Sequence, residues 1–198
     1  AERRLYAAAV AQAEEHAKGW RIESTEHQFE RKLEGMEILG RIDRIERHEA
    51  TGAVRVLDYK SSTKANPPFA SHTATCNAET PDYEVFDATI KGRAKERRWV
   101  DLQLPLYAWA LKHEADSDLQ LGYFNLPALG ADTGVQLLEP YTPELQQHAM
   151  DCASAIVAKV KAQEFWPPAG KPKYDDFKSI LFDQPEAMAE PPQVEGAT

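Results

Sequence analysis

The spacing of apolar residues changes early in the chain, from a helical pattern to an alternation typical of strands. Residues 2–18 are rich in alanine and are followed by Gly19, which favours a helix end because glycine adopts left-handed backbone conformations easily. Three stretches with an approximate alternation of apolar and polar residues come next, and each predicts a strand. These stretches are residues 20–33, 36–47 and 53–61. Thr51-Gly52 supplies turn residues, so the last two strands are predicted to form a β-hairpin.

The middle of the chain has no sustained period. Residues 62–99 are polar and contain Pro67-Pro68 and Pro81, so we expect a long loop with a short helix at most, of a kind that is often functional. The pattern resumes beyond this loop with a helix, two strands and a last helix. These are predicted over residues 101–113, 118–126 and 135–138, and from Thr142-Pro143-Glu144 onward. The order of elements predicts an α/β domain with a mixed sheet.

Composition narrows the class of protein. The chain has 198 residues, of which 42% are hydrophobic, which is sufficient for a core. No apolar run approaches the ~20 residues that span a bilayer, and no signal pattern begins the sequence. Cys76 and Cys152 provide neither a disulfide framework nor a C-x-x-C metal spacing. We therefore expect a soluble, cytoplasmic protein without a membrane partner.

The ends of the sequence suggest how the domain is bounded. Ala1 stands where an initiator Met would, already inside the helical pattern, which favours a fragment of a larger protein; the alternative is an intact chain from which the Met was removed. Residues 1–180 are expected to form one domain, and residues 181–198 an acidic, Pro-containing, disordered tail. The net charge of -9 makes nucleic-acid binding less expected but does not exclude a basic groove.

Three charged residues are predicted to meet on the hairpin. Asp58 and Lys60 share one face of their strand, about 6–7 Å apart. A turn centred on Ala50-Thr51 places Asp43 opposite Asp58, and a shift by one residue places Asp43 opposite Lys60. Two carboxylates about 5 Å apart repel unless one is protonated or a cation lies between them.

A divalent metal ion would remove that repulsion. Mg²⁺ is typically held by one or two carboxylates together with water and phosphate oxygens. A nearby lysine can orient or deprotonate a water, or offset charge in the transition state. The residue types therefore fit metal-assisted phosphodiester hydrolysis. The same spacing also occurs in surface ion pairs of little energetic weight, so both interpretations stay open from the spacing alone.

Three motifs in order carry a family resemblance. G-R-I-D-R-I-E, then V-L-D-Y-K-S, then Q-x-x-x-Y resemble the PD-(D/E)XK nuclease superfamily, and within it the RecB-like branch with the AddB-type nuclease domains. The resemblance implies a restriction-endonuclease-like core, in which a central mixed β-sheet is flanked by helices. It also implies a DNA nuclease of recombination or repair, most simply an exonuclease, with Mg²⁺ or Mn²⁺ as cofactor and a helicase domain or subunit as partner.

The resemblance implies metal-binding roles for four residues. Asp43 and Asp58 match the metal-binding aspartates, and the backbone carbonyl of Tyr59 matches a further ligand. Glu26 resembles a glutamate on the first strand of this branch. The alternative is that Glu26 is an ordinary strand carboxylate that binds no metal.

The resemblance implies catalytic roles for three more residues. Lys60 matches the catalytic lysine. Gln103 and Tyr107 lie four residues apart and hence on one helix face, and they match a pair that lines the site and contacts DNA or the lysine. Taken alone, that pair is also compatible with an ordinary half-buried helix face.

Two departures from the family pattern qualify the prediction. Members of this branch often carry a metal-binding histidine on an upstream helix, and His16 lies on such a helix without the usual surrounding pattern. Tyr174 and Phe177 stand where cysteines would hold an iron–sulfur cluster, so no cluster is expected. A catalytically silent module that binds DNA ends or a helicase partner is therefore the alternative function.

A basic segment precedes the Q-x-x-x-Y helix. K-G-R-A-K-E-R-R-W contains Arg93, Arg97, Arg98 and Trp99. These residues could grip the phosphate backbone, with the indole stacked on a base. The alternative is a solvated segment whose Trp is anchored in the core.

Overall fold

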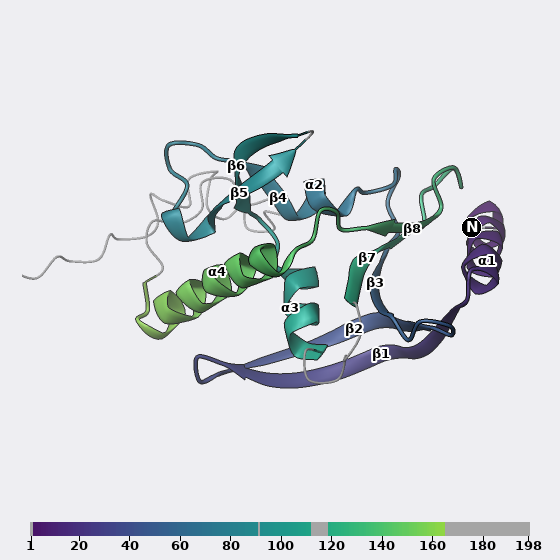
Figure 1. Cartoon of the computed structure of the whole chain (residues 1–198), viewed down its shortest axis with the longest axis horizontal. Helices are drawn as coiled ribbons and strands as arrows, with labels where there is room; N and C mark the ends of the chain where they lie inside the picture. Colours follow the sequence, from purple (N-terminus) through teal and green to yellow (C-terminus); the bar gives the residue numbers. More distant parts are fainter. Residues whose placement is uncertain (1, 91, 112–118, 165–198) are drawn as a thin grey trace, which may run out of the picture. The chain divides into compact units, whose positions relative to one another are not determined.

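The computed structural model of the chain describes residues 2–90, 92–111 and 119–164 (Figure 1). The first elements are α1 (Glu2–Ala17), β1 (Trp20–Leu33), β2 (Met36–His48), β3 (Val54–Lys60), α2 (Pro68–His72) and β4 (Thr73–Thr75). The remaining ones are the 3₁₀ turn η1 (Asp82–Glu84), β5 (Val85–Ile90), β6 (Arg93–Trp99), α3 (Gln103–Leu111), β7 (Leu119–Asn125), β8 (Gly134–Leu137) and α4 (Pro143–Lys161). Among the described residues, no helix combines the length and apolar composition that crossing a membrane requires.

The chain divides into two compact units, Ala1–Ala155 and Ile156–Thr198. The first unit holds both sheets and the predicted site. In the second unit, Lys159 in the last turn of α4 forms an ion pair of 3.0 Å with Glu164, just beyond the helix. The tail predicted over 181–198, together with Tyr174 and Phe177, lies outside the described residues.

The main sheet is mixed, as the sequence predicts. Its strand order is β1-β2-β3-β7-β8, where β3 and β7 pair in parallel and the other neighbours are antiparallel. A parallel pair requires a long crossover, and here α3 lies within it and packs against the sheet through Leu104 and Ala108. This α/β architecture, a mixed sheet flanked by helices, confirms the predicted fold class.

The predicted hairpin is present with one of its two expected registers. Arg44 pairs with Leu57 and Arg47 with Val54. The turn is closed by a hydrogen bond of 2.9 Å from His48 N–H to the Ala53 carbonyl, and Gly52 has the positive φ of 74° that glycine tolerates. The pairing ends at Arg44 and Leu57, and the same register extended by one residue corresponds to Asp43 opposite Asp58 rather than Lys60.

The prediction of a loop over residues 62–99 is wrong. Apart from the predicted short helix, which is α2, this segment contains a second sheet of order β4-β6-β5. β6 reads R-A-K-E-R-R-W and lacks apolar alternation, so its sequence does not predict a strand. β6 forms a strand because it pairs with β4 on one side and β5 on the other, and Phe86 of β5 also stacks on Trp99 with ring centroids 4.8 Å apart.

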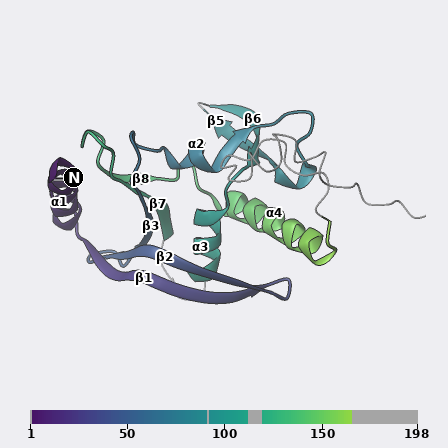
Figure 2. The same ribbon diagram turned by 180° about the vertical axis from the view of Figure 1, so that it is seen from behind.

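The two faces of β3 contact different helices. On one face, Leu57 packs with Ala11 of α1 and Phe124 of β7. On the other face, Val56 packs with Leu104 of α3. Figures 1 and 2 accordingly draw α1 and α3 on opposite sides of β3 and β7. Asp58 and Lys60 alternate with the α1-facing residues, so they belong to the α3 side.

A buried network of charges fixes α1 on its face of the sheet. Arg55 donates to Glu15 Oε2 at 2.6 Å and to Glu46 Oε2 at 2.7 Å, and Glu46 also pairs with Arg44. Lys18 completes the network at 2.7 Å from Glu15. Breaking a buried pair by removing one partner is costly because the other charge is left uncompensated, so these residues hold the helix in one place.

Glu15→Gln should destabilise the fold in a pH-dependent way. Burial alone would raise the pKa of Glu15, but hydrogen bonds from Lys18 and Arg55 outweigh it, and the pKa lies below the usual 4.5. A carboxylate with a lowered folded pKa adds stability above its unfolded pKa, and this is lost as pH falls through the folded value. We expect the free energy of unfolding to drop by about 2 kcal/mol at pH 7, measured by urea denaturation.

The control for this prediction is Glu14→Gln, because Glu14 is an exposed neighbour on the same helix. The difference between wild type and Glu15→Gln should narrow as the pH falls below about 4. An equal difference at pH 7 and pH 3 would contradict an ionic role for Glu15.

Candidate active site

Asp43 lies where β2 and β3 stop pairing. The backbone ladder between them is last seen at Arg44 and Leu57. One step further, Asp43 Oδ2 accepts a hydrogen bond of 3.0 Å from Tyr59 N–H. A side-chain carboxylate thus replaces a backbone acceptor, which holds Asp43 against the end of β3.

Asp58 is a nearly buried carboxylate beside a lysine. It is 4% exposed, and its Oδ2 lies 2.7 Å from Lys60 Nζ. Burial raises the pKa of Asp58 above its usual value, the bond and charge of Lys60 lower it, and the charges of Asp43 and Asp101 raise it again. The raised pKa means that this carboxylate gains from a nearby cation.

The Q-x-x-x-Y motif forms a relay that begins at the lysine. Lys60 Nζ donates to Gln103 Oε1 at 3.2 Å, and Gln103 Nε2 donates to Tyr107 Oη at 2.9 Å. Tyr107 in turn donates to the Arg41 carbonyl at 2.8 Å. The predicted pair therefore contacts the lysine, and it also ties α3 to β2 two residues before Asp43.

The relay is supported at both ends. Asp101, two residues before the helix, accepts a 2.7 Å hydrogen bond from Gln103 N–H through Oδ1, which fixes the first residue of α3. At the other end, Phe29 packs edge-on against Tyr107, with ring centroids 6.1 Å apart. Gly40 makes this possible, because a Cβ at this position would lie 2.3 Å from the Phe29 ring.

The carboxylates fit a magnesium-like ion by their chemistry. Asp43 and Asp58 each use Oδ2 in the contacts above, and among the described residues no hydrogen bond engages Oδ1 of either. Mg²⁺ accepts one or two carboxylates and fills its other positions with water and phosphate. The residues that could hold the ion are Asp43, Asp58 and, through its carbonyl, Tyr59.

Two other residues considered from the sequence have different surroundings: Glu26, which resembles a family ligand, and His16, which does not match the upstream histidine pattern. Glu26 lies 2.8 Å from Arg41 in an exposed ion pair. His16 belongs to α1, which packs on the opposite face of the sheet. In the described ranges, no third His, Cys, Asp or Glu joins the two aspartates in a potential metal group.

The basic segment is a strand whose arginines differ in surroundings. Arg97 donates to the Thr73 hydroxyl at 2.9 Å, and Arg98 pairs with Glu84 at 3.1 Å. Arg93, at the start of β6, is exposed. A phosphate backbone could therefore reach Arg93 directly, whereas Arg97 and Arg98 already have partners within the protein.

Trp99 is not available to stack on a base. Its ring is 3% exposed and stacked on Phe86. This corrects the base-stacking expectation in favour of the alternative, a Trp anchored in the core, and the physical reason is that a large aromatic ring gains most by burial.

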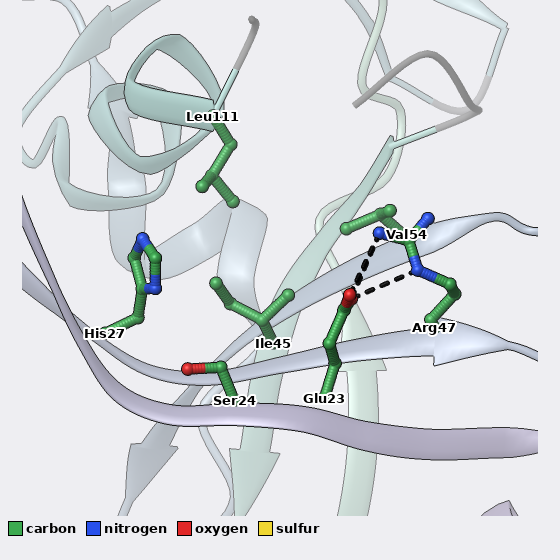
Figure 3. A pocket seen from close by; sticks show the side chains of 7 residues that line it. All are labelled: Glu23, Ser24, His27, Ile45, Arg47, Val54 and Leu111. Atoms are coloured by element: carbon green, nitrogen blue, oxygen red, sulfur yellow. Dashed lines mark hydrogen bonds and ion pairs between the residues drawn. The ribbon is translucent and has the colours of Figure 1, made fainter. Parts of the chain in front are cut away.

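A separate pocket lies on the α3 side of the hairpin (Figure 3). Its lining residues are Glu23, Ser24, His27, Ile45, Arg47, Val54 and Leu111. Glu23 and Arg47 form an ion pair of 3.1 Å at this pocket. None of the predicted catalytic or metal-binding residues lines it.

A family model and a solved structure match this chain. The family model of the PD-(D/E)XK nuclease superfamily matches residues 1–173. No curated protein matches the chain. Among solved structures, the chain is similar to a crystal structure from Eubacterium rectale described as a "putative exonuclease", with a TM-score of 0.42 and 11% sequence identity, over 82% of this chain and 54% of that one. This chain thus spans about half the length of that protein.

The superfamily match extends over far more than half of the sequence and includes every residue of the site. The chain belongs to the PD-(D/E)XK nuclease superfamily.

Proposed function

We propose that the chain is a DNA nuclease of the RecB-like branch that requires Mg²⁺ or Mn²⁺. The observation that supports this most is the placement of Lys60, whose ammonium contacts both Asp58 and Gln103. An ordinary surface ion pair is mobile and adds little stability. Here Lys60 also contacts α3, and α3 in turn hydrogen-bonds to β2, the strand of Asp43. PD-(D/E)XK nucleases generally use divalent metal ions, and the oxygen ligands of Asp43 and Asp58 suit them.

The chain's own residues would act on a phosphodiester in three ways. Asp43 and Asp58 hold negative oxygens beside each other, and the ion they bind would polarise the phosphate and lower the pKa of a water. Lys60 would orient that water or offset charge that develops on the phosphate. Gln103 and Tyr107 keep the ammonium in position, which matters because loose groups lose most of their catalytic effect.

The parent protein is proposed to act in recombination or repair, with a helicase domain or subunit as partner. This rests on the likeness of the three motifs to RecB-like and AddB-type domains. The lysine-to-glutamine contact supports a functional role for the third motif. Exonuclease action is the simplest form of this proposal, and end-labelled linear and circular DNA would distinguish it from endonuclease action.

Replacing Lys60 or Asp58 should abolish cleavage without unfolding the protein. We expect Lys60→Met and Asp58→Asn each to lower the rate of Mn²⁺-dependent cleavage by at least about 100-fold, because acid–base and electrostatic groups contribute that much. The measurement is cleavage of end-labelled linear DNA under single-turnover conditions. Asp87→Asn, at an exposed carboxylate on β5, is the matched control.

Wild-type cleavage by Lys60→Met would refute the assigned role. If the wild-type chain binds DNA without a divalent metal and does not cleave it, the result favours the catalytically silent module. The position of His16 on the opposite face of the sheet is the observation that keeps this second function under test.

Arg93 is proposed to contact the DNA backbone. Arg93→Gln should weaken binding and reduce the slope of log K against log salt by about 1, because one phosphate contact fewer releases one counterion fewer. Fluorescence anisotropy in Ca²⁺, across a salt series, measures this slope. Arg3→Gln, an exposed change on α1, should leave it unchanged, and an equal loss in both variants would remove β6 from the interface.

A further inference from the structure

A buried histidine lies behind the proposed active site and belongs to none of the predicted motifs. His72 is the last residue of α2 and is 0% exposed. Its Nδ1 is 2.9 Å from the Asp101 carbonyl, and its Nε2 is 2.8 Å from Tyr123 Oη. A carbonyl can only accept, so Nδ1 carries the hydrogen, and Nε2 accepts the hydrogen bond that the Tyr123 hydroxyl donates.

The backbone of His72 holds the same neighbouring segment. Its carbonyl accepts a hydrogen bond of 2.9 Å from Val100 N–H and one of 3.4 Å from Asp101 N–H. The side chain thus binds Asp101 and the backbone binds Val100 and Asp101, two of the three residues that connect β6 to α3. Asp101 in turn caps α3 at Gln103, so His72 fixes the point from which the glutamine reaches Lys60.

Tyr123 forms the second connection to the lysine. It lies on β7 and is 1% exposed, and Lys60 Nζ lies 4.8 Å from the centre of its ring. An ammonium over an aromatic face is attracted by the negative face of the ring. The bond from the Tyr123 hydroxyl to His72 fixes how that face is presented. The lysine is thus contacted by a carboxylate, an amide oxygen and an aromatic ring.

We infer that His72 and Tyr123 are positioning residues for Lys60, acting through its two neutral contacts. The inference rests on the proposed function. His72 binds Tyr123 directly and Gln103 through Asp101, so one buried imidazole sets both the ring and the amide that confine the ammonium. The ion pair with Asp58 alone would leave the four-carbon side chain free to pivot, because a point charge has no directional preference.

The matched variants are Tyr123→Phe and Tyr141→Phe. Both remove one phenol hydroxyl that hydrogen-bonds within the protein. The Tyr141 hydroxyl bonds to Gln146 at the start of α4, whereas the Tyr123 hydroxyl bonds to His72. Tyr123→Phe should lower kcat for DNA cleavage by about 10- to 100-fold, because small misplacements of a catalytic group have effects of this size. KM and the Kd for Mn²⁺ should stay unchanged, as should every parameter of Tyr141→Phe.

His72→Gln and His72→Leu provide a second comparison. The glutamine amide can still accept the hydrogen bond of Tyr123, whereas leucine cannot. We expect His72→Gln to retain more of kcat than His72→Leu, with both assayed well below their Tm. A purely structural role would lower Tm in step with side-chain size and leave kcat of the folded fraction unchanged.

A crystal structure of Tyr123→Phe tests the positioning independently of activity. We expect Lys60 Nζ to leave its contact with Gln103 Oε1, or to occupy more than one position. A Lys60 that stays in place, or a kcat equal to that of wild type in both Tyr123→Phe and His72→Leu, would overturn the inference. If wild type cleaves no DNA, the proposed function fails, and the position of Lys60 in the variant still decides the inference.

Discussion

The structure depends on the stabilisation of a carboxylate at the buried end of a strand. Asp58 is nearly enclosed, and burial of a charge is unfavourable unless a partner compensates it. Lys60 supplies that partner two residues later on the same face. A lysine so close to a carboxylate and so near the surface requires other contacts to stay in one position. The contacts with α3 and β7 meet this requirement, and they determine how the surrounding elements are arranged.

The strand that carries this pair also anchors the fold from its other face. Arg55 alternates with Val56 and Asp58, and it binds Glu15 of α1 and Glu46 of β2. One face of β3 thus holds charges that are fully paired inside the protein. The other face holds Asp58 and Lys60, whose pairing leaves one carboxylate oxygen for a further ligand. Because side chains of a β-strand point alternately to its two faces, the seven residues of β3 place the structural ion pairs of Arg55 on one face and the proposed catalytic pair, Asp58 and Lys60, on the other.

The parts of the site that the sequence predicted are those governed by local rules. Alternation in β2 and β3 and the Thr51-Gly52 turn allowed two registers, of which the structure has one. Helical spacing likewise placed Gln103 and Tyr107 on one face, and the structure adds their bonds to Lys60 and to β2. His72 could not be found in this way, because its role depends on contacts 29 and 51 residues away along the chain. The same is true of β6, whose polar sequence forms a strand through its pairing with β4 and β5.

The segment between residues 62 and 99, first expected to be a loop, therefore helps to position the proposed catalytic lysine. Its small sheet ends in β6, whose last residue, Trp99, is anchored on Phe86. The next two residues, Val100 and Asp101, are bound by His72, and α3 begins one residue later at Gln103. Where α3 begins determines where Gln103 lies, and Gln103 determines where the lysine points. The segment between β3 and α3 thus sets the geometry at Lys60 through His72 and Asp101, apart from the proposed contact of its Arg93 with DNA.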